Sequence, residues 1–436
     1  MADTAPPLVE DTCLTTVFAA GMRRRLGDTV MPSRSPPLFT ALSGGPDSTA
    51  LAWLAQAYAI RHGLRHTALI VDHGIRADST AEAVRVADRM RCRGMQVEIL
   101  SVDAPAPQTG LQAWARAQRY ALLLARVRQA RGCLLFGHHA GDQAETVMMR
   151  LARGSGLAGL AAMRVASRRA GVMILRPLLD TPSRALSAYC HAHDLTFERD
   201  PSNLDHRFER VRVRAELAAL TRDGGDMADN LARLARAAGS IDHALLAALA
   251  DAGYLPSIQP SGHALLRLAV TALPVTITAR LLAHLIGQIG SSASPPATTA
   301  LARLAERLLE GRASTLGGVR FSRRDDGWLV TAEIGRRPLR VTVRAGERTM
   351  FGGRWEITSR VDGTIRHLGV AGSGAAGEWD GTPGWCALPP LARRAMPVLE
   401  TLDGALIYPH LLTKDLCVDR AAVATARFLP PAMYRD

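Results

Sequence analysis

The first residues able to do chemistry form a turn rich in serine and glycine. The turn reads Ser43-Gly44-Gly45-Pro46-Asp47-Ser48 and lies between an apolar run at 38–42 and an apolar helix pattern. Glycines let backbone N–H groups approach an anion closely, and a helix start adds donors that lack partners within the helix. The Ser43 and Ser48 hydroxyls add donors, and the Asp47 carboxylate can hold a divalent cation against phosphate. The turn therefore predicts a phosphate-binding loop, with tight helix packing as the alternative.

A second polar group follows the apolar run 133–136 and contains His138, Asp142 and Glu145. The two carboxylates are three residues apart at a helix start, so they lie on one face of that helix. With no cation in sequence reach, they could hold a metal ion or an ammonium group. The alternative is that they cap the helix and pair with its dipole. His138 alone fits a structural histidine as well as a catalytic one.

Arginines recur near these motifs, often one helical turn apart. They are Arg116 and Arg119 in an amphipathic pattern, Arg153 before a Gly-Ser-Gly turn, and Arg207, Arg210 and Arg214, expected on one helix face. Each group could bind phosphate. Each could also be a helix cap or a solvated helix face.

The elements that position these residues alternate between strand and helix. Strands are predicted at 38–42, 66–71, 96–102, 133–136 and 172–175, and helices at 14–26, 46–61, 79–93, 111–131, 142–151 and 182–193. This alternation predicts an α/β fold with a doubly wound parallel sheet. Ligands of such sheets bind at the carboxyl ends of the strands, where the candidate residues, including Asp72, occur.

The rest of the chain has a different pattern. Residues 215–312 are rich in alanine and leucine and predict helices. A hairpin with an Asp-Gly turn is predicted at 319–332, further strands at 339–343 and 354–358, and a glycine-rich loop at 363–384. We therefore predict a lead at 1–36, a catalytic domain at 37–217, a helical domain at 218–313 and a small C-terminal α/β or β domain at 314–436.

Composition narrows the class of protein. The formal net charge of +13 over 436 residues favours a polyanionic partner. Because Lys414 is the single lysine, a GC-rich genome could explain the arginine bias, but not the excess of basic over 40 acidic residues. The six cysteines are scattered with no Cys-x-x-Cys pair, which argues against a zinc ribbon or disulfide framework and favours a reducing cytoplasm. No apolar run approaches the roughly 20 residues that span a bilayer.

The order of the motifs resembles the tRNA(Ile)-lysidine synthetase family of PP-loop ATP pyrophosphatases. The resemblance covers roughly 37–217 and rests on motifs at 43–48, 71–76, 115–120, 138–146, 153–160, 176–179 and 200–203. One departure is Val211, which stands where many relatives have the Asn of an Arg-Asn-x-x-Arg string.

The resemblance implies ATP-dependent formation of lysidine at the wobble cytidine of a tRNA-Ile with a CAU anticodon. ATP adenylates the C2 oxygen of the base, and free L-lysine then displaces AMP. The implied catalytic residues are Asp47, Arg116, His138, Asp142 and Glu145. Ser43, Gly44, Gly45, Pro46, Asp47, Ser48, Asp72 and Arg119 are expected to contact ATP, with Asp47 as the Mg²⁺ ligand, and Asp142, Glu145, Arg153, Arg210 and Arg214 to bind substrate. The two C-terminal domains are expected to contact tRNA. A homodimer is a further hypothesis.

Three other classes of protein are alternatives to this interpretation. A PP-loop tRNA thiolase generally needs a cysteine pair or cluster, and Cys133 lies within a predicted strand. An amidotransferase would need a leading cysteine nucleophile and a glutaminase domain. A non-catalytic RNA-binding protein with a degenerate nucleotide pocket would have no reason to keep the 43–48 loop with the carboxylates of Asp142 and Glu145.

Overall fold

The computed structural model describes residues 12–26, 35–75, 78–198, 207, 209–220, 227–291, 295–335, 338–369, 388–408, 410–411 and 424–429. The chain divides into two compact units, and the boundary follows Gly239. Within the described residues, no helix combines the length and apolar character needed to cross a membrane.

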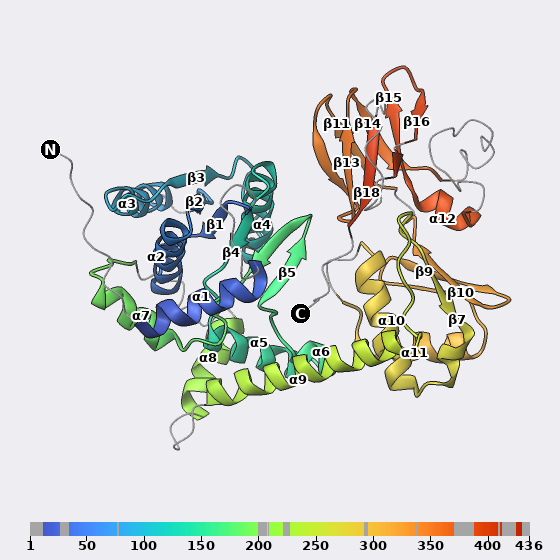
Figure 1. The fold of residues 1–436 in the computed structure, drawn as a ribbon, viewed down its shortest axis with the longest axis horizontal. Coiled ribbons are helices and arrows are strands. Elements are labelled where there is room, and N and C mark those ends of the chain that lie inside the picture. The colour runs from blue at the N-terminus through green and yellow to red at the C-terminus, as the bar shows by residue number, and fades with distance from the viewer. Residues whose placement is uncertain are drawn as a thin grey trace. The chain divides into compact units, whose positions relative to one another are not determined.

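A six-stranded sheet organises the first unit (Figure 1). Its strands are β1 (Leu38–Ala41), β2 (His66–Asp72), β3 (Val97–Ser101), β4 (Cys133–Leu135), β5 (Ala166–Arg169) and β6 (Val172–Leu175). They lie in the order β3-β2-β1-β4-β6-β5, and all neighbours are parallel except the antiparallel pair β5 and β6. The predicted doubly wound parallel sheet is confirmed. β5 was missed because its sequence, Ala-Ser-Arg-Arg, lacks the apolar alternation of a strand.

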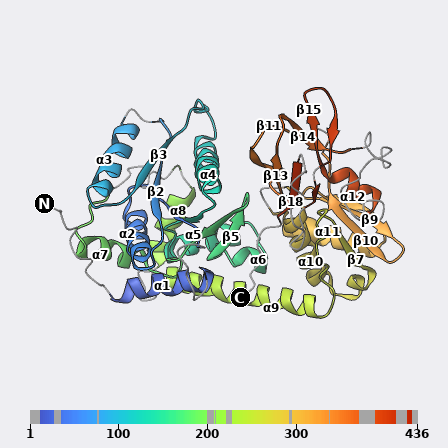
Figure 2. The same ribbon diagram turned by 45° about the horizontal axis from the view of Figure 1, so that its top comes forward.

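Helices cover both faces of this sheet, so its strands are buried on both sides (Figures 1 and 2). The helices are α1 (Thr12–Leu26), α2 (Pro46–Arg61), α3 (Ser79–Arg91), α4 (Leu111–Gln129), α5 (Ala140–Ala152), α6 (Leu157–Leu160), α7 (Ser183–Ala192), α8 (Glu209–Leu220) and α9 (Met227–Asp251), which runs across the unit boundary. Within β1, Leu38 packs into the core on the α2 side and Phe39 into the core on the α4 side. Successive strand residues point to opposite faces, and both faces here are apolar.

The strand order reverses beside β1. The chain builds outward from β1 through β2 to β3, then returns to add β4 and β6 on the other side of β1. The connections that leave β1 and β4 therefore diverge, and a crevice opens at the carboxyl ends of these two strands. The loop 43–48 follows β1 and the group 137–145 follows β4, so the fold brings both motifs to this crevice.

The second unit contains helices and three four-stranded sheets. Its further elements are β7 (Ala264–Arg267), the 3₁₀ helix η3 (Leu268–Ala272), α10 (Val275–Ile289), α11 (Thr298–Leu309), β8 (Ser314–Leu316), β9 (Val319–Arg324), β10 (Gly327–Ala332), β11 (Arg340–Val343), β12 (Arg348–Phe351), β13 (Trp355–Ser359), β14 (Gly363–His367), α12 (Pro390–Ala395), β15 (Pro397–Thr401), β16 (Leu406–Ile407), β17 (His410–Leu411) and β18 (Ala424–Phe428). The sheets β11-β14-β15-β16 and β12-β13-β18-β17 share one apolar core around Phe351, Ile357 and Val398. The C-terminal part is therefore largely β.

Three sequence predictions need correction, two in the second unit and one at the start of α8. Residues 363–367 were assigned to a glycine-rich loop, but they form β14, whose Ile365 is fully buried. The helical stretch 215–312 also contains β7, which pairs with β10 of the confirmed hairpin. Arg207 precedes α8 and does not share its helix face. The domain boundaries predicted after residues 36, 217 and 313 stay predictions. Much of the predicted N-terminal lead and the motif at 200–203 lie outside the described residues.

A buried polar contact joins β1 and β2 beneath the crevice. The ring of His66, 5% exposed, lies 3.0 Å from Thr40 Oγ1 through Nε2 and 2.9 Å from Gln56 Oε1 through Nδ1. Burial lowers the pKa of His66 to about 4, because the cationic ring would lose its hydration. The folded protein therefore holds this ring neutral under conditions in which the unfolded chain protonates it.

This pKa predicts a stability loss in mild acid. With about 6.5 in the unfolded chain and about 4 in the fold, the unfolded state binds the extra proton, so stability is full above pH 6.5 and falls as pH drops toward 4. Between pH 7 and 5 the first unit should lose about 2 kcal/mol more in the wild type than in His66→Gln. Urea unfolding of both proteins at the two pH values measures this difference, and equal losses would contradict the assignment.

Candidate active site

The loop between β1 and α2 is closed by its own hydroxyls. The Ser43 backbone N–H donates to Ser48 Oγ at 3.1 Å. The Ser48 hydroxyl in turn donates to the Gly45 carbonyl at 3.0 Å. Gly44 has a φ of +86°, and an added Cβ would lie 3.0 Å from Val86 Cγ2, so glycine is required there. Gly45 caps α2 without a side-chain hydrogen bond. The backbone donors of the first turn of α2 are therefore available to an anion.

The group after β4 is held by a reciprocal cap at the start of α5. The Gly141 N–H donates to His139 Nδ1 at 3.0 Å, and the His139 N–H donates to Asp142 Oδ2 at 3.1 Å. This arrangement satisfies two backbone donors that the helix itself cannot. It also fixes the positions of an imidazole and a carboxylate at the edge of the crevice.

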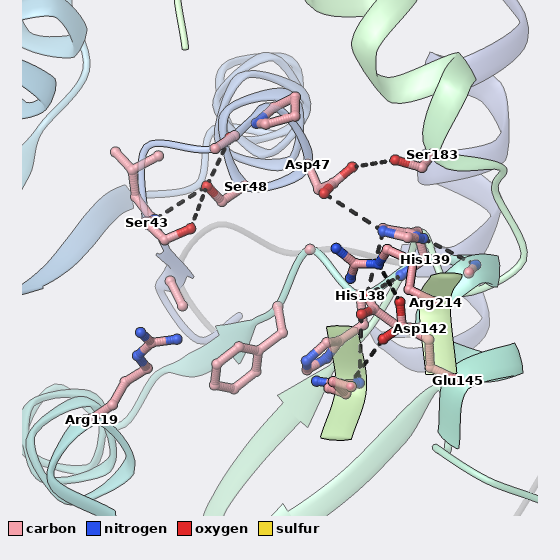
Figure 3. Close-up of a pocket in the computed structure, with 18 of the residues that line it drawn as sticks. Ser43, Asp47, Ser48, Arg119, His138, His139, Asp142, Glu145, Ser183 and Arg214 are labelled. Carbon is pink, nitrogen blue, oxygen red and sulfur yellow. Dashed lines mark hydrogen bonds and ion pairs between the residues drawn. The ribbon is translucent and has the colours of Figure 1, made fainter. Parts of the chain in front are cut away.

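The two motifs are in direct contact. A Cβ added to Gly137 would lie 2.8 Å from the Asp47 carbonyl oxygen and 3.2 Å from the Ser48 nitrogen. His139 Nε2 lies 3.6 Å from Asp47 Oδ2 and 3.6 Å from Asp142 Oδ2, so the ring stands between the two carboxylates (Figure 3). The loop and the acidic helix start therefore form one site.

Asp47 is the less compensated of the two carboxylates. Its Oδ1 accepts a hydrogen bond of 3.1 Å from the Ser183 hydroxyl. Burial raises the pKa of Asp47, His139 and Ser183 oppose this rise, and the negative charge of Asp142 adds to it. The pKa of Asp47 therefore lies above its ordinary value. A further cation beside this carboxylate would stabilise its ionised form.

Asp142 is held in its ionised form. Burial alone would raise its pKa, but His139, His138, Arg210 and the bond from the His139 N–H together outweigh burial, so the net pKa lies below the ordinary value. Its side chain is 14% exposed, and Oδ1 lies 3.5 Å from Arg210 Nη2. Asp142 therefore remains a carboxylate with some access to the crevice.

Glu145 is closely paired, which the sequence alone did not indicate. Its side chain is 3% exposed; Oε1 accepts a 2.7 Å bond from Arg214 Nε, and Oε2 lies 3.2 Å from Arg210 Nε. Both arginines come from α8, and Val211 between them also lines the crevice. The fold thus supplies the cations that are absent from the sequence near Glu145.

His138 and two arginines of α4 complete the crevice. His138 stacks on Phe136 with ring centroids 5.4 Å apart, and its Nδ1 accepts a 3.2 Å hydrogen bond from Arg176 Nε. Arg116 and Arg119 line the same space, as their spacing of one turn predicted. These side chains enclose a cavity of about 1140 Å³ that is large enough for a nucleotide and a second ligand. Residues that line it are Ser43, Gly45, Pro46, Asp47, Ser48, Glu82, Arg116, Arg119, Phe136, Gly137, His138, His139, Asp142, Glu145, Ser183, Glu198, Arg210, Val211 and Arg214.

Asp72 lies outside the residues that line the cavity. Its carboxylate, 7% exposed, accepts bonds from the Gly74 N–H at 3.0 Å, Ser79 Oγ at 2.9 Å and Thr80 Oγ1 at 2.5 Å. These bonds close the turn after β2 and anchor the start of α3. The contact with ATP that is expected of Asp72 stays a prediction.

Arg153 is likewise not brought into the cavity. Its Nη2 pairs with both carboxylate oxygens of Glu209 at 2.6 and 2.8 Å, and its side chain is 60% exposed. The pair joins the end of α5 to the start of α8. A substrate contact by Arg153 stays a prediction that would require this surface pair to open.

Sequence reasoning missed several residues of the site. His139 was read only as part of its motif, Ser183 lies at the start of α7, and Glu198 donates its backbone N–H to the Gly44 carbonyl at 2.8 Å. Ser183 and Glu198 lie more than 130 residues from the loop that they contact, so no local spacing could reveal them. The paired histidines after Gly137 were the one signal available.

The fold and this cavity define a PP-loop nucleotide-binding domain, and residues 19–221 match the PP-loop domain family model. The chain is 44% identical to the tRNA(Ile)-lysidine synthase of Bradyrhizobium diazoefficiens over 48% of this chain and 59% of that protein. It is 34% identical to the tRNA(Ile)-lysidine synthase of Ruegeria pomeroyi over 80% of this chain and 83% of that protein. The chain belongs to the tRNA(Ile)-lysidine synthase family.

A solved structure of the U34-tRNA thiolase NcsA from Methanococcus maripaludis is also similar, with 20% identity and a TM-score of 0.43. The match covers 52% of this chain and 79% of that chain. At this level the likeness says nothing about activity.

The contact at Gly137 predicts that a methyl group there separates the two motifs. Gly137→Ala should destabilise the first unit by about 1–3 kcal/mol and weaken ATP binding about tenfold or more, because the β4 turn must move away from Asp47. Calorimetric ATP titration and thermal unfolding measure both effects. Gly287→Ala is the matched control, since a Cβ there meets no atom within 4 Å inside α10, and it should be neutral or stabilising. Equal behaviour of the two variants would contradict the contact.

Proposed function

We propose that this protein ligates lysine to C2 of the wobble cytidine of a tRNA-Ile with a CAU anticodon, using ATP. The observation that carries the proposal is the single cavity in which the 43–48 loop meets Asp142, in a chain of the tRNA(Ile)-lysidine synthase family. The loop suits the triphosphate of ATP, and the carboxylate suits a cationic amine. One cavity therefore has places for both small substrates.

In the first step, the C2 oxygen of cytosine attacks the α-phosphorus of ATP, and the bond to pyrophosphate breaks. The N–H groups at the start of α2 can bind the departing phosphates. The Ser43 and Ser48 hydroxyls, which bond to each other at 3.1 Å while that of Ser48 also donates to the Gly45 carbonyl at 3.0 Å, would turn from these contacts to join them. Arg116 and Arg119 also line the cavity and can balance the remaining negative charge. This loop lacks a lysine for phosphoryl transfer, which agrees with release of pyrophosphate.

In the second step, the ε-amine of lysine attacks C2, and the bond from C2 to the oxygen that carries AMP breaks. AMP leaves, and the proton released by the amine passes to solvent. We assign the amine to Asp142, which is ionised and partly accessible. Glu145 has its carboxylate engaged by Arg210 and Arg214, so it positions those arginines at the substrate end of the cavity. Asp142 is thus the proposed holder of lysine, and Glu145 is proposed to act through its two arginines.

Mg²⁺ fits beside Asp47. Its carboxylate is a hard oxygen donor in a partly buried place. Burial is the main cause that raises the pKa of Asp47, and a bound cation would offset it. A bound Mg²⁺ would neutralise phosphate charge during departure of pyrophosphate. Asp47 is the residue that would hold it, with Ser183 orienting the carboxylate.

The second unit is proposed to bind the body of the tRNA. A groove of about 430 Å³ lies between α11 and the β8–β9 hairpin. Arg303 and Arg307, one helical turn apart, line it with Arg320, which stands directly opposite Thr315 in the sheet. Its lining includes no carboxylate, so a backbone phosphate is a suitable ligand.

The groove gives a direct test of RNA contact. Arg307→Ala should weaken tRNA binding severalfold at low salt and reduce the slope of binding against salt by about one phosphate contact. Arg312→Ala, which removes an exposed arginine already paired with Glu310, is the control and should leave the slope unchanged. Filter binding at several salt concentrations measures both. An unchanged slope for Arg307→Ala would remove the groove from the tRNA path.

The rival activities find less support in the cavity. No cysteine is among the described residues that line it, and a thiolase generally needs a cysteine pair or cluster for sulfur transfer. A passive RNA-binding protein would not require the ionised Asp142 beside an open phosphate loop. We further propose a cytoplasmic location, where tRNA, ATP and lysine occur together. A homodimer stays a prediction that analytical ultracentrifugation would test.

The ligation itself can be tested with labelled lysine. Incubation with ATP and bulk tRNA should transfer label to one tRNA species, and omission of lysine should leave an adenylated tRNA. Transfer of sulfur would identify a thiolase, and no transfer would identify a passive binder. Either result would overturn the proposal.

Two carboxylate variants should separate the two steps. Asp47→Ala should abolish ATP use and spare tRNA binding, whereas Asp142→Asn should raise the KM for lysine about tenfold or more with little change in the KM for ATP. Asn at 142 keeps an oxygen acceptor for the His139 N–H, so the cap survives. Asp88→Asn, on an exposed pair with Arg91, is the control. Equal effects of Asp142→Asn on both KM values would argue against the lysine assignment.

A further inference from the structure

A buried arginine lies behind His138 and faces its ring. Arg176 follows β6 and is only 9% exposed. Its Nε donates to His138 Nδ1 at 3.2 Å, and its Nη1 donates to the Arg164 carbonyl at 2.9 Å and to Ser167 Oγ at 3.2 Å. Three bonds, one to strand β5 through Ser167 and two to the loop residues His138 and Arg164, hold the guanidinium in one orientation. Arg176 is therefore a rigid donor rather than a mobile surface charge.

This contact determines where the proton of His138 resides. A guanidinium only donates hydrogen bonds and stays protonated in proteins, so Nδ1 of His138 must act as the acceptor. A neutral imidazole with an accepting Nδ1 carries its proton on Nε2. Stacking on Phe136 at 5.4 Å restricts rotation of the ring, so the two nitrogens keep their places.

The surroundings also keep the ring neutral. Burial is the main cause that lowers the pKa of His138 to about 3, Asp142 opposes the fall, and Arg176, Arg210 and Arg116 add to it. An imidazole with such a pKa is a weak base at neutral pH. It remains able to donate a hydrogen bond.

The remaining polar atom of the ring faces the substrate space. His138 lines the cavity, whereas Arg176 is not among the lining residues (Figure 3 shows the His138 ring beside Asp142). His138 Nε2 makes no hydrogen bond within the described part of the chain, and this atom is not fully buried. Nε2–H is thus presented to a ligand.

We propose that Arg176 is a positioning residue that locks His138 as a neutral Nε2–H donor for a substrate oxygen that gains negative charge. The oxygen is a phosphoryl oxygen or the base carbonyl oxygen, which share this chemistry as hydrogen-bond acceptors. The inference rests on the proposed ligation for the identity of that oxygen. It also assigns the acceptor of the lysine amine proton to a group other than His138.

The tautomer can be measured without any activity. In the full-length protein labelled with ¹⁵N-histidine, His138 at neutral pH should show a bare Nδ1 and a protonated Nε2. In Arg176→Met this preference should weaken, and the midpoint of His138 titration should move upward, while the signals of His66 report that the fold is intact. A cationic ring, or a proton on Nδ1, in the wild type would overturn the inference while leaving the ligation proposal untouched.

Side-chain replacement at 138 distinguishes a donor from a base. Gln can place an amide N–H near the position of Nε2 but cannot accept the amine proton as a base, so His138→Gln should stay within about tenfold of wild-type kcat. His138→Ala should lose about 100-fold, the usual cost of one donor to a developing oxyanion. A loss in adenylated-tRNA formation indicates a phosphoryl oxygen, and a loss confined to lysine transfer indicates the base oxygen. Equal losses for Gln and Ala would overturn the donor role.

Discussion

The site depends on the close approach of two backbones where the strand order reverses. Gly137 at the end of β4 lies against the first turn of α2, and an added Cβ would lie only 2.8 Å from the Asp47 carbonyl. This contact sets the distance between a loop suited to phosphate and a helix start that carries carboxylates. The sheet order β2-β1-β4 makes the approach possible, because adjacent parallel strands end at the same edge.

Burial and pairing give three of the carboxylates that line the cavity different environments. Asp47 is incompletely balanced and suits a cation, Asp142 is kept ionised with some access, and Glu145 is enclosed by two arginines. Equivalent carboxylates would have repelled one another and shared protons. Because each has its own partners, the cavity suits the binding of both phosphate and an amine that we propose.

Much of the fold, and the convergence of the 43–48 loop and the group after β4 on one crevice, could be predicted from the chain alone. Local signals sufficed for the five parallel strands, for the 43–48 loop and for Asp142, since each rests on patterns within a few residues. The failures also have local causes. Strand β5 is polar, and β14 lies in a glycine-rich stretch. The contacts of Asp72 with ATP and of Arg153 with substrate stay predictions.

The order of motifs by itself determined the doubly wound sheet, the phosphate loop and the family resemblance, because strand–helix alternation and glycine turns are encoded locally. Only the tertiary structure decided which charges meet. Arg214 reaches Glu145 across 69 residues, Arg176 reaches His138 across 38, and Ser183 reaches Asp47 across 136. The physical reason is that burial sets the strength of a charge interaction, and neither burial nor the choice of partner is a local property of the chain.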